Sequence, residues 1–197
     1  MIKMILVVLL DIIMICADAQ VLKDGEYYIK INDTGKFLAI TGADKKNGAR
    51  LIQWDNEYKT HFSFILTHLG NDIYTIKAKH SGKYLSTEGT PAAGVRIIQW
   101  DWLNQMNQRW HIVKQKGSRG YVMSSAENKM RVVMQHWNSS VRPGNGTYLF
   151  LSGDNTMRGM VMDFKRNEIE AIEENADKQE SPEKPAKPTI KPVKSKQ

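Results

Sequence analysis

The sequence predicts an all-β fold made of three four-stranded repeats that close on one another. The first observation is a repeated strand, because Leu-Ile-Gln-Trp-Asp at 51–55 returns as Ile-Ile-Gln-Trp-Asp at 97–101. The second is a repeated turn and strand, Gly-Lys-Phe-Leu at 35–38 and Gly-Lys-Tyr-Leu at 82–85. A repeat of this size cannot bury its apolar face alone, so the copies must pack on one another. Twelve strands in three-fold pseudo-symmetry form a β-trefoil.

The first repeat contains four segments with a strand pattern. Tyr27, Ile29 and Ile31 alternate with polar residues, as in a half-buried strand. Asn32-Asp33-Thr34-Gly35 predicts a turn after it. The remaining strands of this repeat are expected at 36–40, 50–54 and 62–66.

The second repeat follows the same order. Ten residues separate Trp54 from Phe64, and ten also separate Trp100 from Trp110, so the two repeats share one register at both ends of this loop. Its strands are expected at 74–76, 83–87, 97–100 and 110–112.

The third repeat is shorter and more divergent. Residues 120–124 take the part of 82–86, with the lysine missing, and Trp137 takes the place of Trp100. Residues 148–151 are expected to form the closing strand. The predicted division of the chain is a signal peptide at 1–19, a trefoil domain at 22–152 with repeats at about 22–69, 70–115 and 116–152, a connector at 153–164 and a disordered charged tail at 165–197.

The first residues are typical of a secretory signal peptide. Lys3 gives a short basic start, residues 4–16 are apolar apart from Asp11, and 17–19 fit an A-x-A cleavage site that leaves Gln20 as the new N-terminus. We therefore expect a secreted, extracellular protein, with an uncleaved anchor as the alternative. A spanning helix needs about 20 apolar residues, so no stable membrane span is expected after cleavage.

The single cysteine, Cys16, lies inside the predicted signal peptide. The mature chain then contains no thiol, which excludes disulfides, cysteine-based zinc sites and thiol catalysis from the domain. Hydrophobic residues make up 41% of the chain and charged residues 25%, close to globular averages. The domain is therefore expected to be held by an ordinary hydrophobic core.

The domain is basic and the tail is divided by charge. The whole chain carries a formal net charge of +7, and removal of the predicted signal raises it to +8. A basic surface favours acidic partners such as sulfated or sialylated glycans, although solubility alone would explain it equally well. Acids dominate 165–183 and lysines with prolines dominate 184–197, which predicts a solvated tail, with an interaction arm as the alternative.

The repeated residues resemble the ricin B-chain lectin family, the R-type β-trefoil lectins, over about 22–152. The carriers are the Gly-Lys-aromatic-Leu turns, glycines 48 and 94 before the Trp strands, and Asn107-Gln108-Arg109-Trp110, which is an intact Gln-x-Trp motif. The resemblance implies a targeting or adhesion module with at most one shallow sugar pocket per repeat. Its partners would be glycans or glycoproteins, including acidic ones.

The resemblance also implies what a sugar pocket requires. An acid after the second strand accepts hydrogen bonds from sugar hydroxyls, an aromatic ring stacks on the apolar sugar face, and the Asn and Gln of the motif add hydrogen bonds. The acid is absent here, since its place is taken by Ala39 and Ser86 in the first two repeats and by about Met123 in the third. The residues expected to bind carbohydrate, all in the second repeat, are Trp100, Asp101, Asn107, Gln108 and Ser86. Weaker candidates are Trp54, Asp55 and Trp137.

Purely structural roles would also explain several of these residues. Gln108 and Trp110 fit a role in the trefoil core, and Trp54, Trp100 and Trp137 fit a packing triad. Asp55 and Asp101 could recur because a turn after a strand favours aspartate.

Other chemistry finds little support in the residues. The five histidines show no metal-ligand spacing, and phosphate loops, nucleophile elbows and paired catalytic carboxylates are missing. We therefore expect no enzyme activity, metal, cofactor or nucleic-acid partner. We also expect the protein to be a monomer.

Glycan-acceptor sequons occur at Asn32, Asn138 and Asn145. The alternative function is a trefoil that has lost sugar binding and acts as an extracellular protein-interaction, inhibitor or coat protein.

Overall fold

The fold is all-β, as predicted. The computed structural model describes residues 22–55, 59–134, 143–153 and 160–167. These residues contain twelve strands, and the helices among them are the single 3-10 turns η1 (Thr41–Ala43), η2 (Thr60–Phe62) and η3 (Met106–Gln108). No helix in the described ranges is long and apolar enough to cross a membrane. The predicted signal peptide and nearly all of the predicted tail lie outside the described residues.

Each repeat supplies four strands. The first repeat contains β1 (Gly25–Ile31), β2 (Phe37–Ile40), β3 (Leu51–Trp54) and β4 (Ser63–Gly70). The second contains β5 (Ile73–Ala78), β6 (Tyr84–Thr87), β7 (Ile97–Trp100) and β8 (Trp110–Lys114). The third contains β9 (Tyr121–Ser125), β10 (Arg131–Met134), β11 (Leu149–Ser152) and β12 (Val161–Arg166).

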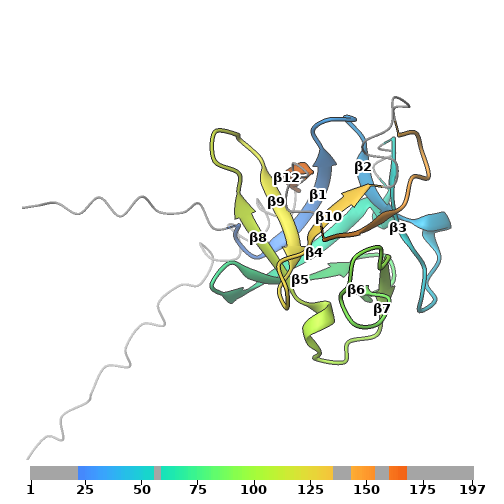
Figure 1. Cartoon of the computed structure of the whole chain (residues 1–197). Coiled ribbons are helices and arrows are strands. Elements are labelled where there is room, and N and C mark those ends of the chain that lie inside the picture. Colours follow the sequence, from blue (N-terminus) through green and yellow to red (C-terminus); the bar gives the residue numbers. More distant parts are fainter. Residues whose placement is uncertain (1–21, 56–58, 135–142, 154–159, 168–197) are drawn as a thin grey trace, which may run out of the picture.

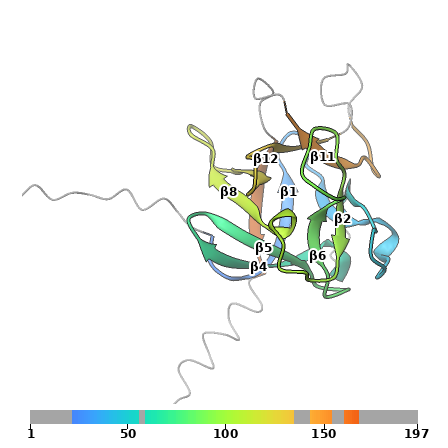
Figure 2. The same cartoon turned by 60° about the horizontal axis from the view of Figure 1, so that its bottom comes forward.

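Six strands close into a barrel. Antiparallel ladders join β1 to β4, β4 to β5, β5 to β8, β8 to β9 and β9 to β12, and β12 returns to β1. The other six form the hairpins β2–β3, β6–β7 and β10–β11 (Figures 1 and 2). A closed barrel leaves no exposed sheet edge among its six strands.

Isolated bridges join the three hairpins into a ring. Arg50 bridges to Ile98, Arg96 bridges to Phe150, and Tyr148 bridges back to Ile52. Each bridge joins the residue just before the third strand of one repeat to the second residue of the third strand in another repeat. Each bridge therefore places side chains from two different repeats next to each other.

The core repeats with the strands. Leu38 and Leu85 are fully buried at matching positions of β2 and β6, and Val132 takes the same place in β10. Phe64 and Trp110 are fully buried where the fourth strands begin. The indole Nε1 of Trp110 donates to the carbonyl oxygen of Leu85 at 3.0 Å. Trp110 of the Gln-x-Trp motif is thus a core residue.

The predicted register of the third repeat is wrong. β9 is the first strand of its repeat, whereas 120–124 were expected to match the second strand. The turn that matches Gly35 and Gly82 is made by Lys129, whose φ of 62° lies in the left-handed region that usually favours glycine. The acid position of this repeat is accordingly Val133, next to Val132 in β10, and not Met123.

The predicted closing strand and domain end also need correction. Residues 148–151 largely coincide with β11, which is a third strand, and Ser152 takes the place of Trp54 and Trp100. The closing strand is β12, which pairs with β1 from Tyr27↔Arg166 to Ile31↔Met162. The fold therefore extends past residue 152, because β12 begins within the expected connector and ends within the expected tail.

Candidate functional site

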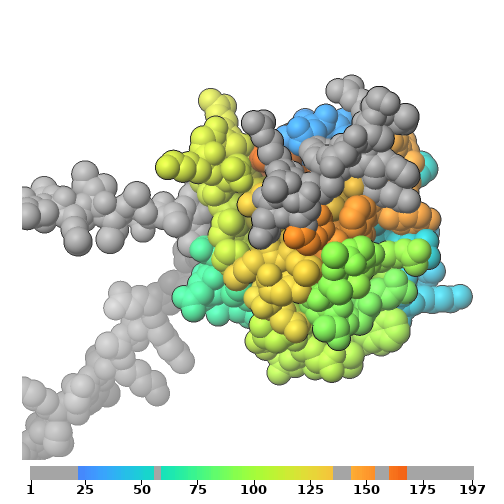
Figure 3. Space-filling model, viewed as in Figure 1, coloured from blue at the N-terminus to red at the C-terminus, as the bar shows by residue number. Residues whose placement is uncertain are grey.

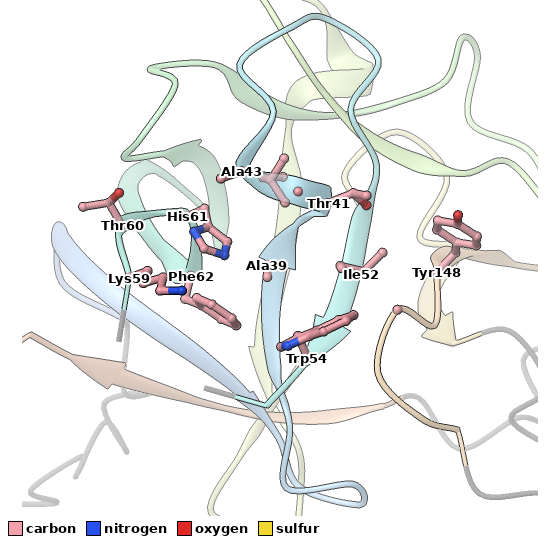
Figure 4. Close-up of a pocket in the computed structure, with 13 residues that line it drawn as sticks. Ala39, Thr41, Ala43, Ile52, Trp54, Lys59, Thr60, His61, Phe62 and Tyr148 are labelled. Atoms are coloured by element: carbon pink, nitrogen blue, oxygen red, sulfur yellow. The ribbon is translucent and has the colours of Figure 1, made fainter. Parts of the chain in front are cut away.

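A pocket of about 950 Å³ opens beside the first repeat, between the β2–β3 hairpin and the 3-10 turn η2. Ala39 and Ile52, 1% and 5% exposed, form its floor. In the view of Figure 4, Trp54 is drawn below these two residues, with Tyr148 on the right and the residues of η2 on the left. The floor is apolar because Ala39 and Ile52 are register partners across the hairpin and face the same way.

Trp54 is the main aromatic surface of the pocket. It ends β3 and remains 37% exposed, although a tryptophan is usually well buried. A Cβ placed on Gly146 would lie 3.6 Å from Cζ3 of Trp54, so the backbone at Gly146 passes close to the indole. Tyr148, two residues further on, faces the pocket from the third repeat through its bridge to Ile52.

Hydrogen-bonding groups line the outer part of the pocket. Thr41, Lys59, Thr60 and His61 contribute side chains there. The ring of His61 lies 4.5 Å from that of Phe62, centroid to centroid, and Phe62 is buried beneath it. Among the described lining residues none carries a carboxylate, so these residues offer no anionic acceptor for sugar hydroxyls.

Asp55, a weaker candidate from the sequence, does not line this pocket. Its carboxylate accepts a hydrogen bond from Lys36 Nζ at 2.6 Å and from Asn145 Nδ2 at 2.9 Å. The backbone N–H of Asp55 in turn donates to Oδ1 of Asn145 at 3.1 Å. The Lys36 bond, followed by the Asn145 bond, holds the pKa of this carboxyl below its ordinary value. Asp55 fastens a third-repeat loop to the first repeat.

The second repeat repeats this arrangement. Asp101 accepts from Lys83 Nζ at 2.5 Å and from Asn47 Nδ2 at 2.7 Å, and its N–H donates to Asn47 Oδ1 at 3.0 Å. The Lys83 bond and then the Asn47 bond lower the pKa of Asp101. We call each such group, Lys36–Asp55–Asn145 and Lys83–Asp101–Asn47, an aspartate clasp.

The predicted second-repeat residues are only partly brought together. Asn107 Nδ2 donates to Ser86 Oγ at 3.2 Å, and Ser86 is 3% exposed. A hollow of about 290 Å³ includes Asn107 in its described lining but not Trp100. Trp100 is 38% exposed at the end of β7. Trp54 and Trp100 are thus not a buried packing pair.

Gln108 has a structural role. It is 1% exposed, its Nε2 donates to the carbonyl oxygen of Asp101 at 2.7 Å, and its Oε1 accepts from the N–H of Leu103 at 2.7 Å. Both ends of the side chain therefore hold the loop that follows β7. This loop displays Trp102, Leu103 and Met106, which are 41%, 53% and 43% exposed. Figure 3 shows the surrounding segment, in green and yellow-green, at the lower edge of the molecule.

The structure describes only some of the remaining candidate residues, which are Trp137 and the three sequon asparagines. Trp137 and Asn138 lie outside the described residues. Asn145 is exposed and belongs to the first-repeat clasp. Asn32, in the turn after β1, donates from Nδ2 to Asp163 Oδ1 at 3.2 Å. Glycosylation of these residues stays a prediction. In the described part of the chain, no three His, Cys, Asp or Glu side chains lie close enough to hold a metal ion.

Sequence reasoning missed Lys59, His61 and Tyr148 as pocket residues. Tyr148 had been assigned to a closing strand, and its contact with Ile52 depends on the closure of the hairpin ring. His61 takes the position of Asn107, which the sequence could have shown through the shared ten-residue spacing. The exchange of Asn-Gln for His-Phe removes the polar motif and leaves a hollow with an aromatic wall.

Comparison with models of protein families shows which family this chain belongs to. The family described as ricin-type beta-trefoil lectin domain-like matches residues 18–100 and 60–151. The chain belongs to this ricin-type lectin-like family. The matched residues cover all three hairpins, which confirms the resemblance seen in the turns and in the Gln-x-Trp motif.

Solved structures show the same fold. A designed three-fold symmetric protein, ThreeFoil, matches with a TM-score of 0.63 and 24% identity over 72% of this chain and 99% of its own. The Rhizoctonia solani agglutinin matches with a TM-score of 0.62 and 18% identity over 74% and 96%. The Macrolepiota procera ricin B-like lectin in complex with lactose matches with a TM-score of 0.58 and 20% identity over 75% and 99%. No curated protein matched by sequence.

Proposed function

We propose that this protein binds carbohydrate and that the first-repeat pocket holds one sugar residue of a glycan. The observation that carries the proposal is the partly exposed indole of Trp54, which lines a pocket of about 950 Å³. Family membership supports it, since Trp54 ends a third strand, where the resemblance implies a stacking aromatic. The family fold also occurs in a lectin solved with lactose.

The chemistry of the pocket suits a ring with one apolar face. The C–H face of a sugar can lie on Trp54, and Tyr148 can contact its edge. Thr60 and Lys59 offer groups for hydroxyl or carboxylate oxygens, whereas Thr41 Oγ1, which donates its proton to the carbonyl oxygen of Arg50 at 3.0 Å, can accept from a sugar hydroxyl. Ala39 stands where the family places an acid, so the pocket lacks the usual acceptor for sugar hydroxyls. A sugar that brings its own negative charge is therefore the preferred ligand, and the basic net charge favours it further.

The second-repeat site remains the second candidate for sugar binding. Trp100 is as exposed as Trp54, and Ser86 and Asn107 are hydrogen-bonded to each other nearby in the same repeat. Its Asp101 carboxylate is held by Lys83 and Asn47, so a sugar at this site would have to share that carboxylate. Because the Asp101 carboxylate is already hydrogen-bonded, we rank the first-repeat pocket above the second-repeat site as the sugar-binding site.

A glycan array on the mature protein tests the proposal, with Trp54→Ala and Trp100→Ala as paired variants. Loss of the stacking surface should weaken binding about tenfold or more, which corresponds to about 1.4 kcal/mol. We expect this loss in Trp54→Ala, and sialylated glycans should outrank their neutral counterparts.

Three results separate the possibilities. A loss confined to Trp100→Ala would assign the sugar to the second repeat. An array without binding would reject the lectin function. Elution by salt without competition from free sugar would indicate charge attraction alone.

The alternative role, a trefoil that binds protein instead of sugar, has one observation in its favour. The loop after β7 displays Trp102, Leu103 and Met106 although Gln108 holds its backbone in place. A Trp102→Ser, Leu103→Ser double variant should keep glycan binding if the protein is a lectin. Partner capture that depends on these two residues, in a protein without glycan binding, would favour the alternative.

We further propose a secreted, monomeric, non-enzymatic protein. Secretion rests on residues 1–19, and mass spectrometry of protein collected from the medium should find a chain that begins at Gln20. An intact N-terminus retained in the membrane fraction would instead identify an uncleaved anchor. The monomeric state can be measured by light scattering on the same material.

A further inference from the structure

A second pocket, of about 480 Å³, lies between residues 22–27, the β8–β9 hairpin and β12. It is built from different strands than the first-repeat pocket, and the described lining residues of the two pockets do not overlap. Three aromatic rings make its wall. Phe164 meets Tyr27 edge-on at 6.2 Å and Tyr121 edge-on at 5.6 Å between ring centroids.

Three cationic side chains line this pocket, and each comes from a different segment. Lys23 precedes β1, Arg119 lies in the β8–β9 turn, and Arg166 ends β12. Asp163 is the one acid among the described lining residues, and Asn32 Nδ2 donates to it at 3.2 Å. Among the described lining residues, three carry a positive charge and one carries a negative charge.

Arg166 is positioned by its surroundings. Its Nη2 donates to the carbonyl oxygen of Asp24 at 3.3 Å. A Cβ at residue 25 would lie 3.1 Å from Arg166 Nε, and Gly25 leaves that space open. Its charge is close enough to Tyr27 to oppose the rise that burial causes in the pKa of that phenol.

The other two cations also lie on fixed backbone. The carbonyl oxygen of Lys23 accepts a hydrogen bond from Tyr27 Oη at 2.8 Å. Arg119 lies in a closed turn, where Gln115 N–H donates to the carbonyl oxygen of Gly120 at 2.9 Å and Gly120 N–H donates to Ser118 Oγ at 3.1 Å. The backbone positions of all three cations are therefore fixed by hydrogen bonds in separate parts of the fold.

From this geometry we propose a second ligand site, for a small ring that carries a sulfate or a carboxylate. The ring would lie against Phe164 and Tyr121, and its anionic group would bind Arg119, Arg166 and Lys23. Guanidinium groups pair well with both anions because each presents parallel N–H donors. A pocket of this size falls within the range of small-ligand sites. The proposal does not depend on sugar binding at Trp54.

Calorimetry on the full chain tests this site with N-acetylglucosamine 6-sulfate and glucuronic acid. N-acetylglucosamine and inorganic sulfate serve as the two half-ligands. We expect at least one of the two anionic sugars to bind, and each half-ligand to bind about tenfold more weakly or worse. The comparison of the two anionic sugars shows whether the natural group is sulfate or carboxylate.

Variants locate the binding. Arg119→Gln and Lys23→Gln remove exposed charges and should each weaken binding about tenfold, whereas Lys45→Gln, an equal charge change on the β2–β3 loop, should not. Trp54→Ala should still bind the anionic sugar at this second site, even though it removes binding at the first-repeat pocket. Circular dichroism confirms that each variant is folded.

Several outcomes would overturn the second site. These are no heat from either anionic sugar at millimolar concentration, equal binding of the neutral sugar, and full binding by Arg119→Gln. A complete loss of anionic-sugar binding in Trp54→Ala would transfer the anionic ligand to the first-repeat pocket. An array that shows no binding through Trp54, beside intact calorimetry, would reject only the proposed function.

Discussion

Asn47, in the first repeat, lies 2.7 Å from the carboxylate of Asp101, in the second. The exchange is reciprocal, because the backbone N–H of Asp101 donates to the Asn47 side chain. Asn145 and Asp55 form the same pair between the third repeat and the first. The recurring Gln-Trp-Asp sequence therefore contains an element that joins repeats, and its aspartate is explained by the fold before any ligand is considered.

The aspartate clasps predict a dependence of stability on acid pH. The ordinary pKa of Asp101 is 3.8, and in the folded protein it lies lower. Its ionised form therefore stabilises the fold at pH values above about 3.8, and this contribution is lost as the pH falls through the folded pKa. Asp55 behaves in the same way.

The measurement is thermal unfolding of wild type and the double variant Asp55→Asn, Asp101→Asn between pH 7 and pH 2. The gap in melting temperature should be present near pH 6 and should shrink below about pH 3.8. Asp33→Asn, in the exposed β1–β2 turn, controls for a carboxylate lost elsewhere. A gap that grows on acidification would contradict the assignment.

Gln99→Leu should lower the free energy of unfolding by about 2–4 kcal/mol, since buried polar groups would lose their partners. Gln99 is fully buried, its Nε2 donates to the carbonyl oxygens of Asp44 at 2.7 Å and Lys46 at 3.0 Å, and its Oε1 accepts from Ser81 Oγ at 2.8 Å. Leu151 occupies the matching place in β11, so a leucine can fit such a position. Urea denaturation measures the loss, and Gln105→Leu on the exposed loop should change it little.

Gly120→Ala should destabilise the protein by about 1–3 kcal/mol, because a methyl group there has no room. Its Cβ would lie 2.5 Å from Val161 Cγ1 and 2.8 Å from the carbonyl oxygen of Met162. Gly144→Ala is the matched control, since nothing lies within 4 Å of its Cβ. Equal unfolding midpoints for the two variants in urea would mean that β12 does not approach Gly120 so closely.

A chain that ends at residue 152 should not unfold cooperatively, whereas a chain that ends at 167 should. The shorter chain lacks β12, which pairs with both β1 and β9 and carries the fully buried Met162. Without it the barrel has two open edges and an exposed interior. Heat capacity scans of residues 20–152 and 20–167 distinguish the two. A single sharp transition in the shorter chain would return the domain end to 152.

The fold was predictable where local geometry repeats and unpredictable where it does not. Gly35 and Gly82 mark their turns in the sequence because glycine adopts a positive φ without strain. Lys129 adopts the same conformation without the residue that signals it, so the third repeat was aligned to the wrong strand. The loss of tryptophan at Ser152 removed the second marker, and β12 was left unrecognised.

The candidate site was less predictable because it depends on contacts between repeats. The intact Asn107-Gln108 motif suggested the second repeat, yet Gln108 uses its side chain to hold the following loop. The first repeat, with Phe62 in that place, opens into the larger hollow, which Tyr148 completes from the third repeat. Pairing across the ring cannot be read from the spacing within one repeat.

The clasps and bridges have a consequence for how such a molecule can be divided. Each clasped hairpin borrows an asparagine from a different repeat, and the first-repeat pocket borrows Tyr148. An excised repeat would hold only part of its own binding surface. Three excised first repeats, joined as a cyclic homotrimer, would regain the clasp through Asn47 but would present Arg50 where the pocket takes Tyr148, so such a trimer should bind the ligand more weakly than the intact chain.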